Sequence, residues 1–138
     1  MTRFGLAVLA YLVPTFALGF VWHLVLFEHA YKALAIYRAD IIIPFGILSM
    51  LIQGTIFAWI FEKAIVPWRA AVWLRTVVYG VGGALLSWSF TTIAVAAKNV
   101  MTSVPDYVAI ETGFTLIQWI MVAPLTAMAF VTRARHAT

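Results

Sequence analysis

The chain has 138 residues, of which 64% are hydrophobic and 10% are charged, and its formal net charge is +4. Because soluble domains carry about 25% charged residues, such a chain would aggregate in water and needs lipid as its solvent. It has no cysteine, which excludes disulfides and every Cys-ligated cofactor. Its Lys and Arg residues form no basic stripe, so we expect no nucleic-acid partner.

The first predicted element, residues 4–27, is an uncharged apolar stretch that follows a short basic start. It is longer than the apolar core of a signal peptide, which has about 7–15 residues, and no small-residue cleavage site follows before Glu28. We therefore expect a transmembrane helix that is retained in the protein.

Three further apolar stretches follow, each longer than the about 20 residues that a helix needs to cross a bilayer. Residues 41–61 carry no charge, residues 71–97 carry only Arg75, and residues 107–131 carry only Glu111. The connections between the stretches are short, so consecutive helices should pack as antiparallel neighbours.

These four stretches predict an all-α fold, an integral membrane, antiparallel four-helix transmembrane bundle. The bundle takes up the chain as a single transmembrane domain over residues 1–138, which leaves no room for a nucleotide-binding module. We therefore expect membrane lipids, and no nucleotide, among the partners.

The basic residues predict the orientation of this bundle. Six of the nine Lys and Arg residues fall at the end that holds the two termini, and three fall at the opposite end. Lys and Arg in short loops are retained in the cytoplasm, so we expect an inner (plasma) membrane protein with both termini cytoplasmic. The six residues are Arg3, Lys63, Arg69, Arg75, Arg133 and Arg135.

Each predicted helix has one face of small or polar residues. In the third helix Gly83, Ser87 and Thr91 recur at four-residue steps, while Gln53 and Gln118 lie near mid-membrane in the second and fourth helices. Polar groups that face lipid are costly, so these faces should turn toward one another. The simplest interpretation is helix packing, with Gln53 and Gln118 hydrogen-bonded to each other.

A polar cluster is predicted near the outer end of the bundle, where His23, Thr91 and Glu111 fall at one depth. In a first interpretation Glu111 pairs with His23 or Lys98 and sets the helix register. In a second, the cluster lines a cavity that binds a small molecule, a lipid headgroup or a proton, because His and Glu change charge near neutral pH when burial shifts them. The predicted ligand-binding residues are His23, Gln53, Thr91, Lys98, Glu111 and Gln118.

A third interpretation is a metal site formed by His23, Glu28, His29, Asp40 and Glu111. Against it, His23 and His29 are six residues apart, which places them on different faces of a helix. A haem held by two histidines is not expected either, because the remaining histidine, His136, falls in the predicted cytoplasmic tail. The chain carries no Walker, HExxH or Gly-x-Ser-x-Gly motif, so no catalytic residue is predicted.

Short motifs along the chain also resemble those of a known group of proteins. In chain order they are Trp22-His23, Leu26-Phe27, Ile43-Pro44-Phe45-Gly46, Gln53-Gly54, Gly83-Ala84-Leu85 and Glu111-x-Gly113. Their order resembles small bacterial four-span membrane proteins classed only as a domain of unknown function. Those proteins are expected to carry Tyr where His23 stands and often Asp where Glu111 stands. The resemblance covers most of the chain and implies a four-helix inner-membrane protein without an assigned activity.

The predicted function is that of a small multi-pass membrane protein with a polar pocket toward the outer leaflet that binds or moves a small ligand, a lipid or a proton. The alternative is an accessory subunit of a larger membrane complex or a homo-oligomer, stabilised through small-residue faces. A metal-dependent membrane enzyme is the third interpretation, and the cofactor, if any, stays unassigned.

Overall fold

Four long apolar helical spans make up most of the described chain, as the sequence predicts. The computed structural model describes residues 2–38 and 40–131, and these ranges contain no strand. Each span is long and apolar enough to cross a membrane, so the protein is a multi-pass helical membrane protein. The spans are Arg3–Leu26, Ile43–Ile65, Val72–Ala96 and Val104–Val131. The predicted tail residues Arg133, Arg135 and His136 lie outside the described residues.

Three of the spans contain a π-helical segment, in which a backbone N–H bonds the carbonyl five residues earlier. The N–H of Phe27 donates to the carbonyl of Trp22 in this way, at 3.0 Å. A π turn inserts one residue and so rotates the following side chains by about 100° around the helix. The elements are α1 (Arg3–Val21), η1 (Trp22–Leu26), α2 (Glu28–Leu34), α3 (Ile43–Ile60), η2 (Phe61–Ile65), α4 (Val72–Trp88), η3 (Ser89–Ile93), α5 (Ala94–Ala96) and α6 (Val104–Val131).

Two helix ends lie three or more residues from their predicted positions. The second span was predicted to end at residue 61, but it continues as η2 through the charged Glu62 and Lys63 to Ile65. The fourth span begins at Val104 rather than at residue 107, because the hydroxyl of Ser103 accepts the free N–H of Asp106 in the first turn, at 3.4 Å. Sequence hydrophobicity missed both ends because polar residues can continue a helix where it leaves the hydrocarbon.

The connection after the first span is itself partly helical, which the sequence analysis did not predict. The short helix α2 turns back over the end of the bundle and ends at Ala35, whose φ of 55° lies in the left-handed region. Its end is anchored on the third connection, since the hydroxyl of Thr102 donates to the carbonyl of Ala33 at 2.8 Å and the N–H of Thr102 donates to that of Leu34 at 3.2 Å.

Replacing Ala35 with glycine should stabilise this cap. A left-handed backbone costs a residue with a Cβ about 1–2 kcal/mol relative to its ordinary conformation, whereas glycine adopts it freely. We expect Ala35→Gly to raise the free energy of unfolding by about 0.5–1 kcal/mol after the greater freedom of glycine in the unfolded chain is counted. Thermal unfolding in detergent measures the change. Ala33→Gly, inside α2, is the matched control and should be destabilising.

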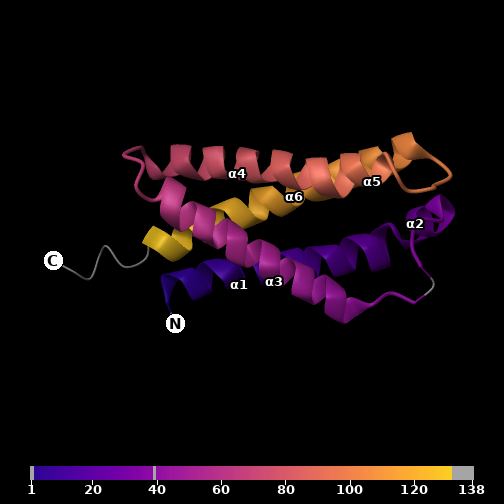
Figure 1. The fold of residues 1–138 in the computed structure, drawn as a ribbon, viewed down its shortest axis with the longest axis horizontal. Helices are drawn as coiled ribbons and strands as arrows, with labels where there is room; N and C mark the ends of the chain where they lie inside the picture. The colour runs from indigo at the N-terminus through magenta and orange to yellow at the C-terminus, as the bar shows by residue number, and fades with distance from the viewer. Residues whose placement is uncertain (1, 39, 132–138) are drawn as a thin grey trace.

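The four spans pack as a helical bundle, as predicted, but one pair of consecutive helices is not in close contact. Extensive contacts join α3 to α1, α1 to α6 and α6 to α4, but α3 and α4 are not closely packed although they are consecutive in the chain. Figure 1 shows that α3 and α4 lie close only near the connection that joins them, and that α3 diverges from α4 away from this connection. The expectation that all consecutive helices pack as neighbours is therefore wrong for this pair. We call the end where α1 begins and α6 ends the proximal end, and the end that carries α2 the distal end.

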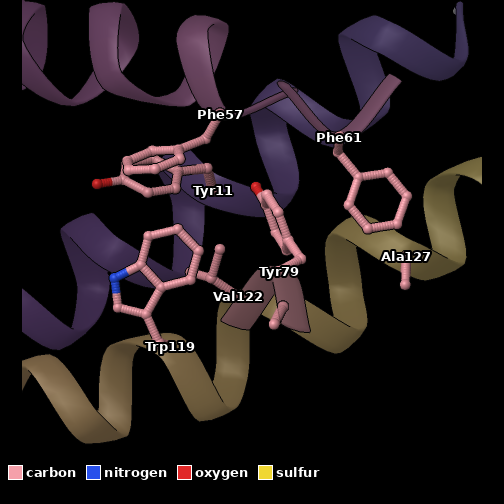
Figure 2. Close-up of a cluster of buried hydrophobic side chains, with 8 residues drawn as sticks. Tyr11, Phe57, Phe61, Tyr79, Trp119, Val122 and Ala127 are labelled. Atoms are coloured by element: carbon pink, nitrogen blue, oxygen red, sulfur yellow. The ribbon is translucent and has the colours of Figure 1, made fainter. Parts of the chain in front are cut away.

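The proximal half is filled by an aromatic core. Figure 2 shows Tyr11 of α1, Phe57 of α3, Tyr79 of α4 and Trp119 of α6 converging on one another. The ring of Trp119 meets that of Phe57 edge-on, with centroids 4.7 Å apart, and that of Tyr79 with centroids 5.5 Å apart. Such edge-on contacts stabilise aromatic pairs beyond the area they bury. These aromatic contacts pack the four spans together in the proximal half.

A second, smaller core lies at the distal end, where Tyr31 and Leu34 of α2 pack with Tyr107 of α6. It fixes α2 over the ends of the first and fourth spans. A cavity lies between these two cores, flanked by α3 and α4.

Candidate functional site

Glu111 is a carboxylate buried in the second turn of α6, with 6% of its surface exposed. Its Oε1 accepts a hydrogen bond from the hydroxyl of Tyr31 at 2.5 Å and lies 3.2 Å from Nε2 of His23. A carboxylate within a membrane span is costly unless it is paired, so these two partners account for its burial. The predicted pairing of Glu111 with His23 agrees with this geometry, and Lys98 is not its partner.

His23 reaches Glu111 from the π-helical segment η1. Its Nδ1 lies 2.9 Å from the carbonyl oxygen of Gly19, one turn earlier, which fixes the ring between the backbone and the carboxylate. The imidazole is also packed between aromatic rings, 4.8 Å from that of Tyr31 and 4.7 Å from that of Phe114. The side chain is 20% exposed, so His23 is the more accessible member of the pair.

Tyr31, which was not among the predicted site residues, covers the site at the distal end. It belongs to α2, is 1% exposed and stacks on Tyr37 with ring centroids 4.9 Å apart. Burial, together with the hydrogen bond to Glu111 and its charge, raises the pKa of Tyr31. Burial and the charge of Glu111 also raise the pKa of Tyr37. Both phenols therefore remain neutral near pH 7.

A second polar layer lies deeper, at the boundary of the aromatic core. The hydroxyl of Tyr11 donates to Oε1 of Gln53 at 2.7 Å and accepts from Nε2 of Gln118 at 3.3 Å. The same Nε2 lies 3.2 Å from the hydroxyl of Thr15. The two glutamines were predicted to bond each other, and the structure instead links them through Tyr11.

A cavity of about 480 Å³ lies between these two polar layers. It is bounded by α1 and α6 at the back, by α3 on one side and by α4 with η3 on the other. Most of its surface is apolar, and the aliphatic part comes mainly from residues 41–50 at the start of α3. Of the predicted ligand-binding residues, the cavity is lined by His23, Gln53, Thr91, Glu111 and Gln118.

Lys98 is the one predicted ligand-binding residue that is not among the cavity's lining residues. It follows the end of α5, where its backbone N–H donates to the carbonyl of Val95. Thr91 does line the cavity, but its hydroxyl donates to the carbonyl of Ser87 at 2.9 Å. Its own carbonyl accepts the hydroxyl of Tyr107 at 2.8 Å. Thr91 therefore forms part of the cavity wall, but its hydroxyl hydrogen and its carbonyl are already engaged in hydrogen bonds within the protein.

The structure does not assemble the proposed metal ligands. Glu28 is occupied by Lys32, one turn along α2, at 2.6 Å, and this pairing lowers the pKa of Glu28. Among the described residues, no three His, Asp or Glu side chains lie close enough together to hold a metal ion. Of the five predicted ligands, only His23 and Glu111 are brought together.

Several residues of the site could not be identified from sequence patterns. Tyr31, Tyr37 and Arg38 belong to the connection after the first span, and Tyr11 lies in an apolar helix. The available signal was composition, because three of the five tyrosines, at positions 31, 37 and 107, flank the predicted polar cluster. Their convergence depends on the turn of α2, which hydrophobicity does not encode.

The fold and the cavity define a structural class: a four-span helical membrane protein whose polar cavity lies in its distal half and is flanked by two helices that do not close against each other. No protein-family model, curated protein or solved structure matches the chain.

Proposed function

We propose that this protein binds a small amphipathic ligand within the membrane, in the cavity between α3 and α4. The observation that carries the proposal is the cavity itself, about 480 Å³, with polar groups such as those of His23, Glu111 and Gln53 on a mostly apolar surface. Ligand pockets commonly have volumes of about 300–1,000 Å³ and the same combination of apolar walls with a few convergent polar groups.

The arrangement of α3 supports access from the lipid. Every residue from Ile43 to Ser49 is exposed, and no close packing against α4 covers them. An apolar tail can therefore enter sideways between the two helices without crossing water. The polar head of the ligand would lie toward the distal end, near Tyr37 and Glu111.

The charge distribution supports an orientation of the cavity toward the outer leaflet of an inner membrane. Among the described residues, Arg3, Lys63, Arg69 and Arg75 lie toward the proximal end. An excess of Lys and Arg at one end favours the cytoplasm for that end. The termini would then be cytoplasmic, and the distal end would face the exterior or periplasm.

A plug in the cavity tests the proposal. A Cβ built on Gly46, which lines the cavity, meets no described atom within 4 Å, so Gly46→Phe fits without a clash at its Cβ and takes up ligand space. We expect the variant to bind mono-oleoylglycerol, a neutral single-chain amphiphile, at least tenfold more weakly than the unsubstituted protein. Native mass spectrometry of the detergent-purified protein, titrated with this lipid, measures the bound fraction.

Gly82→Phe is the matched control. Gly82 also has nothing within 4 Å of a built Cβ, but it is not among the residues that line the cavity. It should bind the lipid as the unsubstituted protein does. Equal binding by all three proteins, or failure of the unsubstituted protein to retain the lipid, would contradict binding in this cavity.

An accessory subunit of a larger membrane complex is a second candidate. It is favoured by the mutual hydrogen bonding of Tyr11, Gln53 and Gln118, which leaves this layer without need of a ligand. It is also favoured by the open face of α4 at Gly82, where a partner helix can approach closely. The same mass spectra separate the two candidates, because they report bound subunits and bound lipid together.

A further inference from the structure

The contacts of His23 require a shared proton between its ring and Glu111. The carbonyl oxygen of Gly19 only accepts hydrogen bonds, so Nδ1 of His23, 2.9 Å away, carries a hydrogen. A neutral ring in that form has a lone pair on Nε2, which faces Oε1 of Glu111 at 3.2 Å. Two lone pairs would repel at this distance. One proton therefore lies between them, on the carboxyl group or on the ring.

The pair is electrically neutral wherever that proton sits. A protonated carboxyl beside a neutral ring has no net charge, and neither has a carboxylate beside an imidazolium. Loss of the proton leaves one negative charge in a site that is only 8% exposed at the Glu111 side chain. Such a charge is costly in a membrane span unless a cation replaces the proton.

Among the described residues, no other titratable side chain near the pair is expected to release this proton in its place. Burial and the charge of Glu111 raise the pKa of Tyr31 and of Tyr37. The hydroxyl of Tyr107 donates a hydrogen bond to the carbonyl of Thr91. The cavity-lining residues of α3 and α4 include no titratable side chain. Arg38 is exposed at the rim and stays charged, so it does not change the proton count.

The remaining walls of the cavity suit a positive charge carried on an apolar body. Aromatic rings of Phe16, Phe20, Tyr37, Tyr107 and Phe114 line it, and the faces of such rings attract cations. Both hydrogen bonds that Glu111 makes with described residues go to Oε1. Oε2 is therefore left for a ligand in the cavity that Glu111 lines.

We infer that the ligand is a lipophilic organic cation and that its binding releases one proton from the His23–Glu111 pair. The cation enters, the shared proton leaves to water at the distal rim, and the site stays neutral throughout. This inference rests on the proposed function, since it names the class of ligand that the same cavity takes.

Two ions of matched shape and opposite charge test the inference: tetraphenylphosphonium and tetraphenylborate. We expect the purified full-length protein to bind the phosphonium at least tenfold more tightly than the borate in isothermal titration calorimetry, with empty micelles subtracted. Titrations in two buffers of different ionisation enthalpy should give one proton released per cation bound. Because each cation displaces one proton, the affinity should fall up to tenfold for each unit by which the pH is lowered.

Glu111→Gln removes the negative charge but keeps the shape of the side chain. This variant should bind the phosphonium at least tenfold more weakly and release no proton, while its circular dichroism shows the same helix content. The two-ion comparison on the unsubstituted protein does not depend on how this variant folds.

Equal or tighter binding of tetraphenylborate would show that Arg38 and the apolar walls dominate, and would overturn the inference. So would cation binding without proton release. In either case the mono-oleoylglycerol experiment still decides the proposed function, because that probe is uncharged. Failure of the uncharged lipid to bind would instead overturn the proposed function itself.

Discussion

Replacing Gly83 with alanine is expected to lower the free energy of unfolding by about 1–3 kcal/mol, the cost of overpacking a dense core. A Cβ at Gly83 would lie 2.1 Å from Cη2 of Trp119. The indole cannot move aside freely, because it contacts the rings of Phe57 and Tyr79 and its Nε1 donates to the hydroxyl of Ser87 at 3.1 Å. Thermal or denaturant unfolding in detergent measures the loss.

The adjacent glycine provides the control for this prediction. Gly82→Ala meets nothing within 4 Å and should be neutral or slightly stabilising, since alanine favours the helix more than glycine. In a Trp119→Leu background, Gly83→Ala should lose most of its cost, because the clashing indole is gone. An equal cost at positions 82 and 83 would mean that the close α4–α6 contact is not formed.

Removing the hydroxyl oxygen of Tyr31 should also lower the free energy of unfolding substantially. Tyr31→Phe leaves the buried Glu111 without its shortest hydrogen bond, 2.5 Å long. Hydrogen bonds to charged groups contribute about 1.5–3 kcal/mol, so we expect a loss of that order in the free energy of unfolding. We also expect α2 to detach more readily from the bundle, which faster hydrogen exchange at residues 28–34 would report.

Tyr107→Phe is the comparison for Tyr31→Phe. Tyr107 is buried at the same end, but its hydroxyl donates to a neutral backbone carbonyl, that of Thr91, so its removal should cost only about 0.5–1.5 kcal/mol. With Glu111→Gln already present, Tyr31→Phe should cost no more than Tyr107→Phe. If the Tyr31 variant is the milder of the two in the unsubstituted background, the carboxylate does not depend on this bond.

The fold class was predictable because it depends on an average property of long segments. An uncharged stretch such as residues 4–27 needs a membrane whatever its detailed order, and the four stretches predicted the four spans of the structure. The helix ends were less predictable. Glu62 and Lys63 continue a helix by one π turn, which no hydrophobic pattern reveals.

Part of the site was predictable by depth. His23 and Glu111 were predicted to lie at one depth, since each is a few residues from the distal end of its span, and the structure brings them into contact. The role of Tyr31 was not predictable, because it depends on the left-handed residue Ala35 and on the Thr102 contact that hold α2 in place. A contact between two segments that are distant in the sequence cannot be predicted from the residues of either segment alone.

The lack of close packing between α3 and α4 was not predictable from the sequence for a similar reason. Short connections favour antiparallel neighbours, and the six residues between η2 and α4 fit that rule. The packing is decided elsewhere, at Gly54, where the absence of a side chain lets α3 pack against the ring of Tyr11. This contact favours α1 as the partner of α3, and α4 packs on α6 instead.

Because α3 packs on the rest of the protein near Gly54 and Phe57 and carries only exposed residues from Ile43 to Ser49, its distal half is only loosely held by the other described helices. In a bilayer, this half of α3 would be surrounded mainly by acyl chains. We therefore expect the width of the cavity to depend on how tightly the surrounding acyl chains are packed.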